Sequence, residues 1–108
     1  MKFQLKLKGI KMNQKLEKYL EDRLNSLGRL VKNLGESVQA QVLLGCETEH
    51  HLKGKIYLAE SILFLPGKKI VAKSSSNTIF NAIDEMKQEL HLAIKEYKER
   101  LIERKRKK

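Results

Sequence analysis

The spacing of the hydrophobic residues changes along the chain, and this change constrains the fold more than any other feature. Between Lys2 and Lys8 hydrophobic and polar residues alternate, which predicts a strand with one buried face. After Asn13, a suitable N-cap residue, hydrophobic residues recur every three or four positions, which predicts an amphipathic helix. This helical stripe consists of Leu16, Leu20, Leu24, Leu27 and Val31. Gly28 and Gly35 are expected to mark the exit from the helix.

Three more strands are predicted in the middle of the chain. Residues 38–45 alternate hydrophobic and polar side chains, whereas the polar residues 46–53 are interpreted as a loop. Lys55–Leu65 is rich in Ile, Leu, Tyr and Phe, and residues 68–73 form a second strand-like run. Between these two runs stands Pro66-Gly67, a pair that favours a turn. The last two strands therefore form a hairpin.

The C-terminal third of the chain predicts a long helix. Residues 74–78 are too polar to continue the strand but are well suited to cap a helix, and a period of 3.6 residues runs from Ile79 to about Leu101. The element order is then β-α-β-β-β-α. This order predicts an α+β fold, a four-stranded sheet with two helices packed on one face, similar to a double-stranded-RNA-binding domain.

The composition limits the partners of such a domain. The chain has 108 residues, with 23 Lys and Arg against 13 Asp and Glu, and a formal charge of +10. Its size suits one domain, residues 1–103, followed by a basic C-terminal tail, residues 104–108. We expect a cytoplasmic protein, because no signal-peptide pattern is present and Cys46, the single cysteine, suits a reducing compartment. We also expect the free protein to be a monomer. The charge predicts nucleic acid as the partner, rather than a membrane or a small-molecule substrate.

The last helix separates its charges into two edges. The basic edge, one residue beyond the core stripe, consists of Lys87, His91, Lys95 and Lys98. The acidic edge, one residue before that stripe, consists of Glu85, Glu89 and Glu96, extended by Glu99 and Glu103. Segregated signs favour an oriented binding surface over charges scattered for solubility. The five consecutive cations of residues 104–108 predict a frayed tail that a polyanion neutralises.

Candidate RNA-binding residues occur in both halves of the chain. They are Lys8, Lys11, Lys15, Arg23, Arg29, Lys87, His91, Lys95, Lys98, Arg100, Arg104, Lys105 and Arg106. Cations on the rims of a groove between two helices can follow a phosphate backbone. The open sheet face is a second candidate surface, because it is made positive by Lys6, Lys8, Lys69 and Lys73. The pattern alone does not choose between these two faces.

Several short motifs, taken in order, carry a family resemblance. The first helix contains Leu16-Glu17-Lys18-Tyr19-Leu20-Glu21-Asp22-Arg23-Leu24, with Leu27. Further on are His50-His51-Leu52-Lys53-Gly54 with Tyr57, the turn Leu65-Pro66-Gly67, and Ala82-Ile83-Asp84 at the start of the last helix. These motifs resemble those of the ribosome hibernation factors, also called ribosome-associated inhibitors or ribosomal subunit interface proteins. The first is similar to the family's L-x-x-Y-V-x-x-K-L-x-x-L, and the last matches its A-I-D.

The resemblance implies a binding function without catalysis. It implies binding to the small ribosomal subunit and its rRNA, in the channel that messenger and transfer RNA otherwise occupy, so that translation is blocked sterically in idle ribosomes. The chain resembles the short form, which has no second domain, and the family needs no cofactor. The sequence departs from the family pattern at Ser26, Glu89 and Glu96, where many members carry lysine, and at Thr78, where an Asp usually precedes the helix.

Other functions remain as alternatives. A double-stranded-RNA-binding module or RNA chaperone acting on free RNA has the same topology and charge, and a protein-interaction modulator of transcription is a third reading. An enzyme is not expected, because the common nucleotide, acyl-transfer and zincin motifs are missing. Cys46 with His50 and His51 falls short of a zinc framework. Asp84 has no evident partner and is expected to favour the N-terminal dipole of the last helix.

Overall fold

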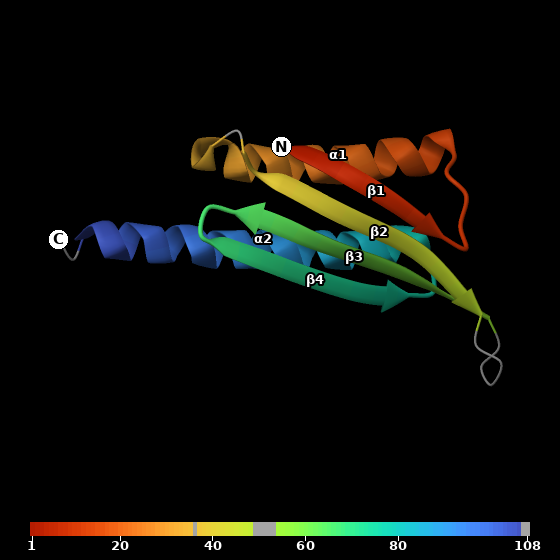
Figure 1. Cartoon of the computed structure of the whole chain (residues 1–108). Coiled ribbons are helices and arrows are strands. Elements are labelled where there is room, and N and C mark those ends of the chain that lie inside the picture. The colour runs from red at the N-terminus through yellow and green to blue at the C-terminus, as the bar shows by residue number, and fades with distance from the viewer. Residues whose placement is uncertain (36, 49–53, 107–108) are drawn as a thin grey trace.

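The computed structural model describes residues 1–35, 37–48 and 54–106, and its element order is the predicted β-α-β-β-β-α. The strands are β1 (Lys2–Lys8), β2 (Gln39–Thr48), β3 (Lys55–Leu65) and β4 (Lys68–Ser76). The helices are α1 (Gln14–Val31), the short 3₁₀ helix η1 (Lys32–Leu34) and α2 (Ile79–Arg106). Both long helices lie behind one face of the sheet and run in the same direction (Figure 1). The predicted α+β fold is thereby confirmed.

The sheet is mixed, with the strand order β1-β2-β3-β4. β1 pairs in parallel with β2, and the other two pairs are antiparallel. A parallel pair needs a crossover, and here α1 supplies it. The register aligns Leu5, Val42, Ser61 and Ala72 across all four strands, and the last three of these are buried. Odd-numbered β1 and β3 residues and even-numbered β2 and β4 residues therefore face the helices.

The hydrophobic core lies between the sheet and the two helices. Every residue of the predicted first-helix stripe is buried: Leu16, Leu20, Leu24, Leu27 and Val31. On α2 the buried residues are Ile79, Ala82, Ile83, Met86, Leu90, Ile94 and Tyr97. The Tyr97 hydroxyl donates a 2.6 Å hydrogen bond to the carbonyl oxygen of Pro66, which ties the helix to the β3–β4 turn. Neither helix in the described part of the chain has the long apolar stretch that a membrane span requires.

Both predicted helix starts are capped by side chains. Asn13 accepts a hydrogen bond from the backbone nitrogen of Leu16 at 2.8 Å. Thr78 accepts one from the backbone nitrogen of Asn81 at 3.1 Å. Each bond satisfies one of the free N–H groups in a first helical turn, so polar residues begin both helices where the sequence predicts.

Three predicted boundaries were wrong. β4 continues through Ser76, because β3 is long enough to pair with it and the half-buried Ser74 hydroxyl bonds the carbonyl oxygen of Ala82 at 2.6 Å. β2 continues to Thr48, opposite the start of β3, and residues 49–53 of the predicted loop lie outside the described residues. Gly28 lies inside α1 rather than at its exit.

The second helix is also longer than the hydrophobic period indicates. It ends at Arg106 rather than near Leu101. Its 28 residues correspond to about 42 Å of helix, and its C-terminal turns extend beyond the sheet in Figure 1. The pattern of hydrophobic residues stops where packing against the sheet stops, whereas the backbone hydrogen bonds of the helix continue.

A candidate nucleic-acid interface

The two long helices meet through a cluster of side chains near their N-terminal ends. The rings of Tyr19 in α1 and Phe80 in α2 pack edge to face, with 4.8 Å between their centroids. The ammonium of Lys15 lies 5.3 Å from the centroid of the Phe80 ring. Tyr19 donates a hydrogen bond of 2.5 Å to Oδ2 of Asp84 in α2. We call Lys15, Tyr19, Arg23, Phe80 and Asp84 the interhelix cluster.

Arg23 completes this cluster from the α1 side. Its Nε lies 3.1 Å from Oδ1 of Asp84, and its guanidinium carbon lies 3.8 Å from the centroid of the Tyr19 ring. Asp84 therefore bonds two α1 side chains that are four residues apart, one through each carboxylate oxygen. This arrangement fixes the direction of the guanidinium through both a hydrogen bond and a cation–π contact.

Asp84 thus has partners, and the prediction that it lacks one was wrong. Those partners precede it by 65 and 61 residues, so only the tertiary fold brings them together. The hydrogen bond to Asp84, with a smaller effect of burial, raises the pKa of Tyr19 above its ordinary value. Burial lowers the pKa of Arg23, but the hydrogen bond to Asp84 and the charge effects of Tyr19 and Asp84 together outweigh burial and raise the pKa, so the guanidinium stays cationic.

Most of the predicted basic edge of α2 continues the line of residues that face α1. Lys87 and His91 follow Phe80 and Asp84 at helical spacing, which puts them on the same side of the helix. Lys87, His91 and Lys98 are half-buried, whereas Lys95 is exposed. All five residues of the acidic edge are exposed: Glu85, Glu89, Glu96, Glu99 and Glu103. Lys15 and Arg23 lie at the contact between the helices, and helical spacing places Lys87, His91 and Lys98 in line with that contact along α2. We call the surface that carries these five residues the interhelix groove.

The remaining candidate residues lie elsewhere. Arg29 is exposed near the end of α1 and borders a hollow with Met1 and Phe3. Lys8 ends β1, and Lys11 is an exposed residue of the connection from β1 to α1. The candidates near the C-terminus belong to the end of α2, and they are Arg100, Arg104, Lys105 and Arg106. Arg100 and Arg104 border a hollow at the β3–β4 turn.

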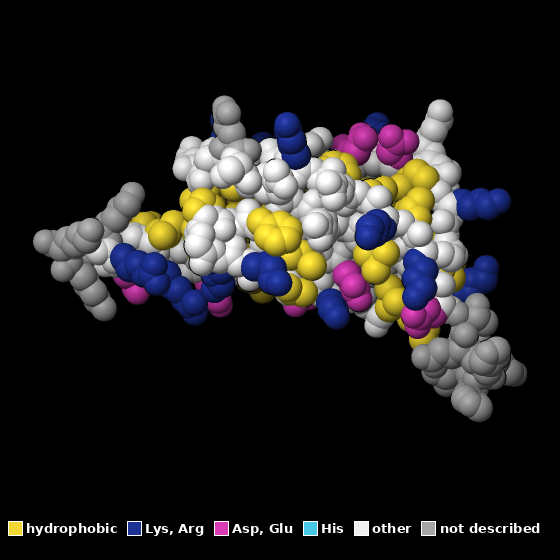
Figure 2. Space-filling model, in the orientation of Figure 1, with side chains coloured by type: hydrophobic (Ala, Val, Ile, Leu, Met, Phe, Trp, Pro, Cys, Tyr) yellow, Lys and Arg dark blue, Asp and Glu magenta, His cyan; other side chains and the backbone are white. Residues whose placement is uncertain are grey.

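The open face of the sheet is a separate surface. The register places Lys6, Lys8, Lys69 and Lys73 on this face, away from the helices. Figure 2 shows hydrophobic side chains interspersed with Lys and Arg side chains over the sheet. The helix face and the open sheet face, the two candidate RNA-binding faces, therefore lie on opposite sides of the molecule.

The structure describes only one of the three residues Cys46, His50 and His51, which the sequence does not favour as a metal site. Cys46 is half-buried and pairs with Tyr57 across the β2–β3 ladder, while His50 and His51 lie outside the described residues. Within residues 1–35, 37–48 and 54–106, no three His, Cys, Asp or Glu side chains form a group suited to a metal ion.

Comparisons with known proteins agree with this architecture. Residues 3–102 match the model of a family described as "Sigma 54 modulation protein / S30EA ribosomal protein". The N-terminal domain of Protein Y from Thermus thermophilus is 25% identical, with a TM-score of 0.69 over 90% of this chain and 99% of that chain. A ribosomal subunit interface protein from Coxiella burnetii has the same fold, with a TM-score of 0.68 at 17% identity over 91% of this chain and 98% of that chain. No curated protein sequence matches at a significant level.

Proposed function

The chain belongs to the Sigma 54 modulation protein / S30EA ribosomal protein family, and from this premise we propose that it silences idle ribosomes by steric occlusion. Family membership makes it a ribosome-associated protein. In our proposal it binds the small ribosomal subunit in the channel for messenger and transfer RNA, and it blocks translation by occupying that space. The partner is ribosomal RNA, and no catalytic step is involved.

The interhelix groove is the observation that carries this proposal. It carries Lys15 and Arg23 from α1 and Lys87, His91 and Lys98 from α2, and all of these except Lys15 are half-buried. A side chain held by its neighbours loses less conformational entropy on binding than a free lysine does. Such a groove suits the backbone of a folded RNA, because phosphate contacts fix position and orientation without reading sequence.

The cations near the C-terminus are assigned a supporting role. Residues 1–103 would form the binding unit, and residues 104–108 would add affinity by releasing counterions from the RNA. The protein would act as a monomer in the cytoplasm. The glutamates of the acidic edge are exposed and lie on a different side of α2 from the half-buried cations. They therefore do not obstruct a phosphate backbone that follows the interhelix groove.

Sedimentation of the protein with purified ribosomes tests this proposal. We expect it to co-sediment with small subunits and vacant ribosomes, and to inhibit translation in proportion to the ribosomes it occupies. Excess messenger and initiator transfer RNA should displace it, because they compete for one channel. Inhibition that grows with time at substoichiometric protein would contradict a steric mechanism. Sedimentation with free double-stranded RNA but not with ribosomes would favour an RNA-binding module or chaperone.

A further inference from the structure

We propose that the open face of the sheet is a second RNA-binding surface, specific for single-stranded RNA and independent of the interhelix groove. The helix side of the sheet is filled by the core, so the opposite side is free to bind a partner. Four rows of side chains cross it from β1 to β4. The strand register gives the residues of each row, and within the rows the side chains of the outer strands differ in chemistry from those of the inner strands.

All the cations in these rows lie on the outer strands β1 and β4, whereas the inner strands β2 and β3 carry amide, carboxylate and apolar side chains. The first row contains Lys2, Gln39, Phe64 and Lys69, and the second contains Gln4, Gln41, Ile62 and Val71. The third row contains Lys6, Leu43, Glu60 and Lys73, and the fourth contains Lys8, Gly45, Leu58 and Ser75. Successive rows lie about 7 Å apart along the strands. Cations therefore line both outer strands, β1 and β4.

The part of the face formed by β3 and β4 exposes apolar side chains to water. Phe64 is 37% exposed and Val71 is 46% exposed, and Ile62 lies between β2 and β4 in the row beside Phe64. Exposed apolar surface has a free-energy cost that a partner removes, so such a patch marks a binding site when polar groups surround it. An aromatic ring on a sheet face can stack on a nucleobase of any kind.

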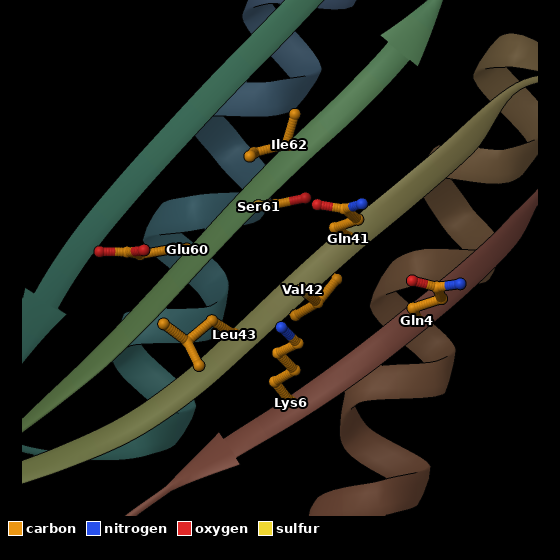
Figure 3. Close-up of a pocket in the computed structure, with 8 residues that line it drawn as sticks. All are labelled: Gln4, Lys6, Gln41, Val42, Leu43, Glu60, Ser61 and Ile62. Atoms are coloured by element: carbon orange, nitrogen blue, oxygen red, sulfur yellow. The ribbon is translucent and has the colours of Figure 1, made fainter.

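Amides and a carboxylate next to this patch can bond the edges of bases. Gln4, Gln41 and Glu60 border a hollow of about 180 Å³ on the open face (Figure 3). Glu60 points toward β4, where its carboxylate lies 3.9 Å from the ammonium of Lys73. Amide groups both donate and accept hydrogen bonds, and a carboxylate accepts from amino groups of bases.

Single-stranded RNA fits these groups better than an extended protein segment does. The backbone groups in the interior of the sheet are already paired with neighbouring strands, so a peptide lying on this face finds no backbone ladder to join. A single strand of RNA presents its own base edges, base faces and phosphates, and each has a counterpart here. A duplex keeps its bases stacked and paired, so it cannot use the Phe64 ring.

Fluorescence anisotropy with a labelled oligouridylate of about 12 nucleotides tests the proposal, with an RNA duplex of the same length as comparison. We expect the single strand to bind more tightly than the duplex to a protein with Lys87→Gln and Lys98→Gln, in which the interhelix groove is weakened. Phe64→Ala should weaken oligouridylate binding about 5- to 100-fold. Phe64→Leu, which keeps an apolar side chain, should also weaken it, because leucine lacks a ring to stack.

The matched control is Leu92→Ala, which removes a 52% exposed apolar side chain from α2 and should leave oligouridylate binding unchanged. Equal binding by the wild type and both Phe64 variants would overturn the proposal. So would a self-association in sedimentation that Phe64→Ala abolishes while RNA binding persists, because the face would then belong to a second copy. The Phe64 variants should still bind ribosomes through the interhelix groove. The oligouridylate and ribosome measurements therefore test the two proposals independently.

Discussion

At the scale of single residues, Asp84 joins the two helices through both of its carboxylate oxygens. It bonds Tyr19 and Arg23, and Tyr19 in turn packs against Phe80. The sequence places Asp84 within a recognisable A-I-D motif, yet nothing in its spacing reveals a partner on the first helix. Interactions between residues so far apart in the chain depend on how the helices dock, so local patterns cannot predict them.

Replacing Asp84 with Asn should lower the free energy of unfolding by about 1 kcal/mol. The amide keeps a carbonyl oxygen for Tyr19 but removes the charge that attracts Arg23. The side chains of this ion pair are 33% and 46% exposed, so solvent screening keeps the effect modest. Urea unfolding measures the change, with Glu85→Gln as the control at the next, exposed position. Equal stabilities of these two variants would contradict a role for Asp84 in joining the helices.

Tyr19 should ionise at a higher pH than an ordinary tyrosine, because the hydrogen bond to Asp84 raises its pKa above 10.0. A raised pKa in the folded state stabilises the protein below pH 10.0, and that contribution disappears as the pH rises through the folded-state value. The difference in tyrosinate absorbance between the wild type and Tyr19→Phe reports the midpoint. A midpoint at or below that of free tyrosine would show that this bond does not form in solution.

At the scale of elements, the sequence predicts that a helix or strand exists, and which of the two it is, better than it predicts where the element begins and ends. The hydrophobic stripe of α1 and the hydrophobic alternation of β1 predict these two elements directly. A helix packs one face on a core with a period of 3.6 residues, and a strand does so with a period of two. Ser74 and Ser76 were expected to leave the strand because residues 74–78 are polar, but pairing with β3 keeps both serines in β4. Residues 102–106 carry no apolar period, so the last turns of α2 could not be predicted from hydrophobicity.

The two edges of α2 should respond differently to removal of charge. Replacing Lys87, Lys95 and Lys98 with Gln should weaken ribosome binding, and the slope of log affinity against log salt should fall by about one unit for each phosphate that the protein no longer neutralises. Replacing Glu85, Glu89 and Glu96 with Gln removes charges of the opposite sign from exposed positions and should leave binding unchanged or strengthen it. Similar reductions in affinity from both triple variants would contradict an oriented binding surface.

At the scale of the whole molecule, the domain is elongated, with extents of 56 × 28 × 17 Å. Its two broad faces are formed by different elements, the helices on one side and the open sheet on the other (Figure 1). Net charge alone predicts an anionic partner but not which face meets it. The separation of the cations between the two faces follows from the strand register and the docking of the helices, which only the structure provides.

Truncation after Glu103 should change the melting temperature by no more than a few degrees. Leu101 packs against the core, whereas Ile102, Glu103 and Arg104 are exposed, so the deletion leaves the core intact. Ribosome affinity should fall most at low ionic strength, where counterion release contributes most. A full-length control with Arg104, Lys105 and Arg106 replaced by Gln separates charge from chain length. A large drop in melting temperature would instead assign these residues a structural role.

The parallel pairing of β1 with β2 has a consequence for the order of folding. Lys2 pairs with Gln39, so this pairing closes a long loop, whereas β3 and β4 are joined by a two-residue turn. The β3–β4 hairpin and β2 can assemble first, whereas β1 can pair with β2 only after α1 has formed the crossover. In hydrogen exchange after refolding, we expect the amides of β1 to acquire protection last. On a translating ribosome, the segment synthesised first would thus be among the last to reach its native place.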